Sequence, residues 1–229
     1  MEILDKIPFL INKDALMRQL MIEKDSEDEK EFDELIQLAI QCGRPKAVFL
    51  QAFIDEKTND GVVINGITFT SKTLRHNLSD VQRIFPFVIT CGTEMDDHFP
   101  PGSDILKDFW WDALKMQLLN AARLTLRKHL SERFRLGKTA SMSPGSGDVG
   151  IWHIEQQRQL FALLGDVKNA IGVELTDTCL MVPNKTGSGI LYPAQIDFQG
   201  CEVCHRENCP SRRAAFNASL WEEIQPGSR

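Results

Sequence analysis

The chain has 229 residues, 42% of them hydrophobic and 25% charged, which is the composition of a globular protein and excludes a disordered, collagenous or coiled-coil chain. Its formal net charge of −6 argues against broad binding to nucleic acid or to anionic membranes. No apolar run approaches the roughly 18 residues of a membrane span, and the start of the sequence lacks a signal-peptide pattern, so we expect a cytoplasmic protein.

The first 93 residues predict two helices followed by several strands. Asn12 and Ser26 are suited to cap helices, the second of which ends before Gly43 and Pro45. Residues 47–54 then predict a strand. A hairpin follows, because Asn65-Gly66 separates two β-branched runs and both positions of a type I′ turn need a positive φ. Further on we expect a short helix over 74–82, a strand over 85–90 and a turn over 91–93.

The second half begins with the longest predicted helix, from a cap at Ser103 to about residue 134. Residues 137–150 hold so many Gly, Pro and Ser residues that we expect a loop there. A helix over 154–170 and strands over 173–182 and 189–192 complete the prediction, with 184–189 as a hairpin connection. Long helices segregated from a few antiparallel strands indicate a single α+β domain.

Several short motifs stand in an order that resembles a known family. They are Thr90-Cys91-Gly92-Thr93-Glu94-Met95, Pro144, Gly165-Asp166-Val167-Lys168, Ile171-Gly172-Val173-Glu174-Leu175-Thr176-Asp177, Met181, Pro183 and Ser188-Gly189. Over roughly residues 84–192 the chain resembles the activation (reactivation) domain of cobalamin-dependent methionine synthase, in a stand-alone form. The resemblance implies long helices packed on a curved, mainly antiparallel sheet.

The resemblance also implies a ligand and a partner. The family's domain binds S-adenosylmethionine in a shallow site and presents it to cobalamin held on another domain, where one electron and one methyl group restore methylcobalamin. Carried onto this sequence, the site lies between the 138–148 loop and the Ser188-Gly189 turn. The implied ligand-binding residues are Lys138, Ala140, Ser141, Pro144, Ser188 and Gly189. The implied partner is a corrinoid protein or a cobalamin-dependent methionine synthase.

The chain departs from the family in its ligand loop. The family has an Arg followed by Pro-Ala-Pro-Gly-Tyr-Pro, where this chain has Lys138 to Pro144 with Met142-Ser143 in place of Gly-Tyr. Lys cannot make the planar bidentate contact of Arg with a carboxylate, although it can pair with one as a point charge. The chain also lacks the substrate and cobalamin domains of methionine synthase, so whether it is itself an enzyme stays open.

Three cysteines near the C-terminus form the strongest chemical signal. Cys201, Cys204 and Cys209 have the spacing of thiolates that converge on one soft metal, either an iron–sulfur cluster or zinc. The fourth ligand is open among Cys91, Cys179, His205 and an external group, and three metal-free thiols are the plainer alternative. We therefore divide the chain into an α+β domain over 1–199 and a cysteine-rich tail over 200–229.

Two charged segments have less specific patterns. Glu94, Asp96, Asp97 and His98 are residue types that bind metals, but their crowded spacing fits the solvated start of a helix better. Three arginines of the tail either dock a partner or are simply solvated: Arg206, Arg212 and Arg213. No Ser/His/Asp or Cys/His nucleophilic set is present in the sequence pattern.

The sequence therefore favours reductive activation of a corrinoid or cobalamin methyltransferase such as methionine synthase. S-adenosylmethionine is the expected ligand, and a cysteine-ligated iron–sulfur centre could supply the electron. The alternative is a non-catalytic scaffold of corrinoid metabolism with a structural zinc site. We expect no nucleic-acid or membrane partner, and we leave homo-oligomer formation open.

Overall fold

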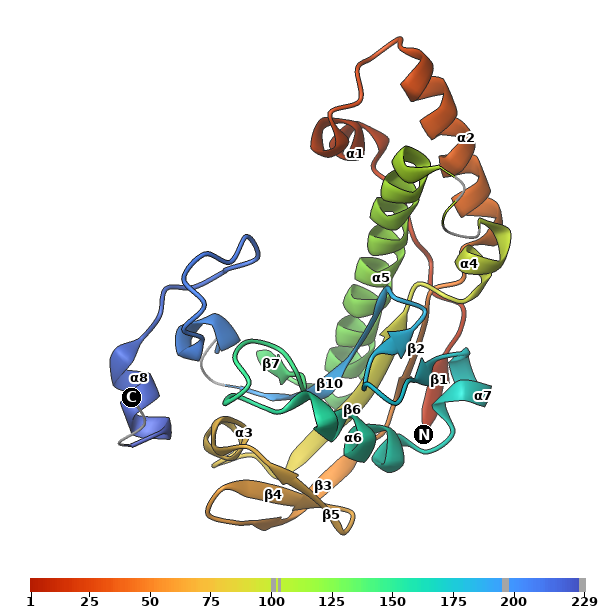
Figure 1. Ribbon diagram of the computed structural model, residues 1–229. Coiled ribbons are helices and arrows are strands. Elements are labelled where there is room, and N and C mark those ends of the chain that lie inside the picture. The colour runs from red at the N-terminus through yellow and green to blue at the C-terminus, as the bar shows by residue number, and fades with distance from the viewer. Residues whose placement is uncertain (100–101, 103, 195–197, 227–229) are drawn as a thin grey trace.

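The computed structural model describes residues 1–99, 102, 104–194 and 198–226. The antiparallel sheet curls into a half-barrel, and helices pack on it. The longest helix lies along the sheet (Figure 1). The strands are β1 (Glu2–Leu4), β2 (Lys46–Phe49), β3 (Ala52–Lys57), β4 (Gly61–Ile64), β5 (Ile67–Thr70), β6 (Arg83–Thr90), β7 (Thr139–Met142), β8 (Glu174–Leu175), β9 (Met181–Val182) and β10 (Thr186–Pro193). The α-helices are α1 (Lys13–Leu20), α2 (Glu27–Cys42), α3 (Lys72–Asn77), α4 (Glu94–His98), α5 (Ile105–Phe134), α6 (Gln157–Leu164), α7 (Val167–Ile171) and α8 (Ala218–Ile224); 3-10 turns cover Ile154–Gln156 and Gly200–Val203. The predicted α+β class and curved antiparallel sheet are confirmed.

Strand β6 is the centre of the sheet. Its C-terminal half pairs with β2 on one edge and with β10 on the other, and β10 in turn pairs with β7. The start of β6 pairs with β3, from which the sheet continues through β4 to β5. Every one of these pairings is antiparallel. Because seven of the eight residues of β6 are buried, this strand has the near-continuous hydrophobic sequence of a central strand.

The predicted strand over 47–54 is instead two strands, β2 and β3. The interruption at Leu50 and Gln51 lies opposite Pro86 of β6, whose oxygen accepts from the Leu50 N–H at 3.0 Å. Proline has no N–H to return that bond, so the ladder breaks there. The β4–β5 hairpin is confirmed at its turn, where Asn65 and Gly66 have φ values of 49° and 75°.

Helix α5 contributes side chains to two hydrophobic clusters. Its C-terminal half packs against one face of the sheet, whereas its first turns join α1, α2 and α4 in a second cluster that includes Trp110 and Trp111. The opposite face of the sheet is covered by α3, α6, α7 and part of the tail. The predicted cap Ser103 lies outside the described residues; Asp104 caps α5 by accepting from the N–H groups of Leu106 and Lys107. None of the described helices combines the length and the apolar character needed to cross a membrane.

The predicted helix over 154–170 is divided into a 3-10 turn, α6 and α7. Gly165 has a φ of 87° and ends α6, and the side chain of Asp166 then caps α7 by accepting from the Asn169 N–H at 3.1 Å. The apolar spacing continues across this break, which explains why the sequence pattern indicated one helix. A positive φ at a glycine is the physical reason why there are two.

The predictions for the final strands need three corrections. Residues 173–182 form a short hairpin of β8 and β9 and not one strand. Residues 139–142, expected in a loop, form β7, and Ser188-Gly189, expected in a turn, lies inside β10. The local composition of these segments favours turns. Strand β10, however, pairs with both β6 and β7, and the backbone hydrogen bonds from these distant segments stabilise an extended backbone despite the glycines.

The tail packs on the sheet. Val203, Cys204 and Ile224 are buried in the same cluster as residues of β6, β7 and β10. The tail thus contributes side chains to the core of residues 1–199. The division of the chain into a domain over 1–199 and a tail over 200–229 stays a prediction.

Two glycines of β10 offer a matched test of the strand. A Cβ at Gly189 would lie 2.3 Å from the backbone oxygen of Met142, whereas a Cβ at Gly187 would meet only the Ile89 side chain at 3.4 Å. We expect Gly189→Ala to lower the free energy of unfolding by about 1–3 kcal/mol, as overpacking does, and Gly187→Ala to lower it by less than about 1 kcal/mol. Equal effects in urea unfolding would contradict the close approach of β7 to Gly189.

Candidate functional site

Two of the motifs that carry the family resemblance, residues 90–95 and 171–177, meet where β2, β6 and β10 reach the same end of the sheet. Thr90 of β6 is in register with Lys46 of β2 and Thr186 of β10. The hydroxyl of Thr186 donates to Thr90 Oγ1 at 3.1 Å, and the same atom accepts from the Gly92 N–H at 3.2 Å. Gly172, which follows α7, packs so tightly on Thr93 that a Cβ there would lie 3.0 Å from it. Segments far apart in the sequence therefore form one cluster.

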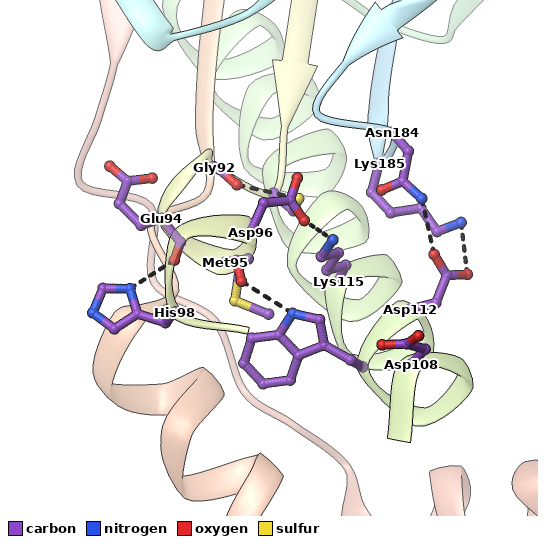
Figure 2. A network of polar contacts seen from close by, with 12 residues as sticks. Gly92, Glu94, Met95, Asp96, His98, Asp108, Asp112, Lys115, Asn184 and Lys185 are labelled. Carbon is purple, nitrogen blue, oxygen red and sulfur yellow. Dashed lines mark hydrogen bonds and ion pairs between the residues drawn. The ribbon is translucent and has the colours of Figure 1, made fainter. Parts of the chain in front are cut away.

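A network of charged side chains surrounds this cluster (Figure 2). Lys115 of α5 is only 6% exposed and pairs with Asp96 of α4. Lys46 Nζ lies 2.5 Å from Glu94 Oε1. The expectation of a purely solvated helix start is therefore wrong for Glu94 and Asp96, because each carboxylate neutralises a lysine that the sheet or α5 places beside it.

The other side of the network ties the start of β10 to α5. Lys185 Nζ lies 2.7 Å from Asp112 Oδ2, and the Asn184 amide donates to Asp112 Oδ1 at 3.1 Å (Figure 2). The Lys185 carbonyl accepts from the Cys91 N–H at 3.0 Å. Burial raises the pKa of Cys91 to about 12, so its thiol stays protonated. The network therefore positions backbone segments and offers no activated nucleophile.

Lys115 provides a test of this positioning. We expect Lys115→Ala to lower the free energy of unfolding by about 3 kcal/mol, the lower end of the range for breaking a buried ion pair, because Asp96 is left without its partner but is partly exposed. Lys128→Ala is the matched control on the same helix, since its pair with Glu132 is exposed and contributes at most about 0.5 kcal/mol. Denaturant unfolding of both variants measures the difference. Equal losses would show that the buried pair does not hold α4 on α5.

Most of the ligand-binding residues predicted from the resemblance lie together on β7 and β10. Ala140 and Ser141 of β7 pair with Tyr192 and Leu191 of β10. Gly189 lies against the end of β7, where it allows the Met142 carbonyl to approach. Ala140 is buried in the core over the whole residue.

A hydrogen-bonded chain joins the remaining predicted residues. The buried Ser188 hydroxyl donates to Gln157 Oε1 at 2.8 Å, and the Gln157 amide donates to the Pro144 carbonyl at 3.3 Å. The Ser143 hydroxyl donates to the Ser188 carbonyl at 2.5 Å. Gln157, at the start of α6, thus connects β10 with the loop after β7. Gln157 could not be predicted from the sequence, because a polar residue at a helix start has no distinctive spacing.

Lys138 is separated from this group. It is exposed and precedes β7 at the end opposite Met142, which corresponds to about 13 Å along an extended strand. Arg127 of α5 is the cation that the fold brings to β7, where its guanidinium donates to Ser141 Oγ at 3.1 Å. Arg127 could not be predicted either, because basic residues are common near a helix C-terminus, where they interact favourably with the helix dipole.

The cysteine loop of the tail is organised by Arg212. Its guanidinium donates to four backbone carbonyls, those of Cys201, Cys204, Arg206 and Ala214, at 2.7–3.0 Å. All six cysteines of the chain are free thiols. Across the described ranges no three His, Cys, Asp or Glu side chains are grouped so that they could hold a metal ion. Cys201, Cys204 and Cys209 are therefore not gathered into a metal site in this structure.

Two surface hollows lie elsewhere. One of about 600 Å³ is formed by the segment around Ile7 and Leu10 and by the end of α2, and one of about 370 Å³ lies between α3 and α8. Neither includes the residues predicted to bind a ligand. Among those residues Ala140, Pro144, Ser188 and Gly189 are buried, Ser141 is half-buried and Lys138 is exposed, so their role in ligand binding stays a prediction.

Comparison with known proteins supports the fold. No family model matches the sequence, and no curated protein matches it. Among solved structures, the chain is similar to the crystal structure of the MetH reactivation domain bound to AdoHcy, with a TM-score of 0.58 and 14% sequence identity. The likeness covers 86% of this chain and 80% of that one. It shows the fold. The architecture implied by the sequence resemblance is thereby confirmed, and AdoHcy is a ligand of that neighbour.

Proposed function

We propose that this chain activates a corrinoid or cobalamin-dependent methyltransferase, such as methionine synthase, and that it binds S-adenosylmethionine. The observation that carries the proposal is the position of the predicted ligand-binding residues. In a fold similar to that of a domain solved with AdoHcy, Ser141, Pro144, Ser188 and Gly189 lie on or beside the paired strands β7 and β10. Cobalamin itself would be held by the partner.

The polar groups of this surface suit the ligand. Lys138 is the residue proposed to pair with the methionyl carboxylate, and Ser141 presents its hydroxyl beside the Arg127 guanidinium. Ser188 and Gln157 hold the strand and the adjoining loop in one geometry, so a ligand would meet a surface that is already ordered. When bound, S-adenosylmethionine supplies a methyl group to the partner's reduced cobalt.

Calorimetry with S-adenosylmethionine and S-adenosylhomocysteine tests the ligand. We expect Lys138→Ala to weaken binding by about 1.5–3 kcal/mol, or roughly 10- to 150-fold, as for a lost hydrogen bond to a charged group. Lys30→Ala, which removes an exposed lysine on α2, should leave the affinity unchanged. Unchanged affinity of the Lys138 variant would remove this residue from the site, and a wild-type chain that binds neither compound would contradict the ligand proposal.

The role in activation needs a separate measurement. A methionine synthase that lacks its own reactivation domain, inactivated as cob(II)alamin, should regain activity when this chain, a reductant and S-adenosylmethionine are added together. Omission of the chain is the control. Ligand binding without recovery of activity would favour the non-catalytic scaffold.

Metal binding by the tail is a separate proposal that is supported by cysteine spacing alone. If Cys201, Cys204 and Cys209 ligate one iron–sulfur cluster or zinc ion, each Cys→Ser variant should lose most of the metal after anaerobic reconstitution, because the ligands act as a unit. Cys42→Ser is the control, since Cys42 is buried at the end of α2 beside Met95. Analysis of iron, sulfide and zinc measures the loss. A wild-type chain that takes up no metal would leave these residues as ordinary thiols.

A further inference from the structure

The larger of the two surface hollows has no role in the function proposed above. It measures about 600 Å³ and lies between the segment 5–11, which joins β1 to α1, and the end of α2. Small-molecule pockets in proteins usually measure roughly 300–1,000 Å³, so the hollow has the size of a ligand site. Its lining comes from neither β7 nor β10. A ligand bound here would therefore be separate from the predicted S-adenosylmethionine site.

The segment 5–11 is anchored on the interior by alternate side chains. Ile7 is buried in the cluster between the sheet and α5, and Phe9 packs on the cluster that contains α1 and α2. Gly43, at the end of α2, lets the two walls approach closely, since a Cβ there would lie 3.0 Å from Phe9 Cζ and 2.6 Å from Leu118 Cδ2. The walls of the hollow are therefore preformed, and a ligand would not have to order them.

Apolar side chains line the hollow from both walls. Leu10 of the segment 5–11 is 93% exposed, and Ile40 in the last turn of α2 is 50% exposed. Single exposed apolar residues are common on protein surfaces, but these two face one concavity. An apolar molecule in the hollow would remove both side chains from water, which favours binding.

Two cations line the same hollow. Arg44 Nη1 donates to the Gly43 carbonyl at 2.7 Å, and since Gly43 also lines the hollow, this bond keeps the guanidinium at its wall. In the part of the chain that the structure describes, no carboxylate lies within 4.0 Å of a side-chain nitrogen of Arg44 or Lys6. Asp5 lines the hollow as well. The two cations thus exceed the one carboxylate by a single positive charge, which attracts an anion.

We propose that this hollow binds a small molecule with an apolar body and one carboxylate, of the class of medium-chain fatty acids. The apolar body would lie against Leu10 and Ile40, and the carboxylate would pair with Arg44, whose parallel N–H donors match two carboxylate oxygens. One negative charge balances the one excess positive charge of the lining. The size of the hollow favours a small molecule over a protein, because a stable protein interface covers roughly 800 Å² on each partner.

Titration calorimetry with decanoate, below its micelle concentration, tests the site. The wild-type chain should bind decanoate at least about tenfold more tightly than decyltrimethylammonium, which has the same alkyl chain and the opposite charge. Arg44→Ala should weaken decanoate binding at least about tenfold, as expected for the loss of a charge-assisted hydrogen bond. Arg18→Ala is the matched control, since it removes an exposed arginine of α1 that does not line the hollow.

A pair of exposed leucines tests the apolar wall. Leu10→Ser should weaken decanoate binding at least about fivefold, because the alkyl chain loses an apolar contact. Leu124→Ser should leave it unchanged, since Leu124 is an exposed leucine of α5 outside the hollow. The side chains of Arg44 and Leu10 are exposed, so both variants should keep the unfolding midpoint of the wild type. Unfolding measurements thus separate loss of the site from loss of the fold.

Three results would overturn the proposal. They are a wild-type chain that does not bind decanoate, equal affinity for decanoate and decyltrimethylammonium, and an Arg44→Ala or Leu10→Ser variant that binds decanoate as the wild type does. The affinity for S-adenosylmethionine is measured on the Arg44→Ala variant as well. It should equal that of the wild type, because the hollow contains none of the residues predicted to bind that ligand. Failure of this site is therefore distinguishable from failure of the proposed function.

Discussion

The pairing of β10 with β6 joins strands whose paired residues lie 96 to 106 positions apart, from Thr186 with Thr90 to Leu191 with Phe85, and the position of β7 depends on it. On its free edge β10 carries β7, which has no other partner in the sheet over the described residues. At its start the same pairing places Lys185 beside Cys91 and Asp112. Loss of this ladder would therefore separate the proposed ligand surface from the rest of the sheet.

The charged side chains around the start of β10 are paired. At the strand end, each lysine of the polar network has a carboxylate partner, so this region holds α4 and the β9–β10 connection in place. Because each of these charges is compensated at close range, the pairs hold segments that lie far apart in the sequence.

The tail has a structural role in the core of the preceding segment. Its buried residues complete the core over β7 and β10, and Arg212 closes the cysteine loop by binding backbone carbonyls. The His205 ring packs against Phe216 and Trp221, and the backbone N–H of His205 donates to Asp148 Oδ2 at 2.6 Å. The tail therefore also contacts the loop after β7. These contacts connect the cysteine segment with the ligand surface proposed on β7 and β10.

The sequence by itself determined the features that depend on neighbouring residues. The Asn65-Gly66 turn, the caps at Asn12 and Ser26 and the length of α5 follow from local propensity and hydrophobic period, and the structure has them. The order of the family motifs predicted the curved antiparallel fold. Local signals were wrong for Ser188-Gly189 and for residues 139–142, which have turn composition but form paired strands. Only the tertiary structure decided those segments and the ion pairs of Lys115 and Lys185. The physical reason is that hydrogen bonds and charges from distant parts of the chain outweigh the weak conformational preferences of a few residues.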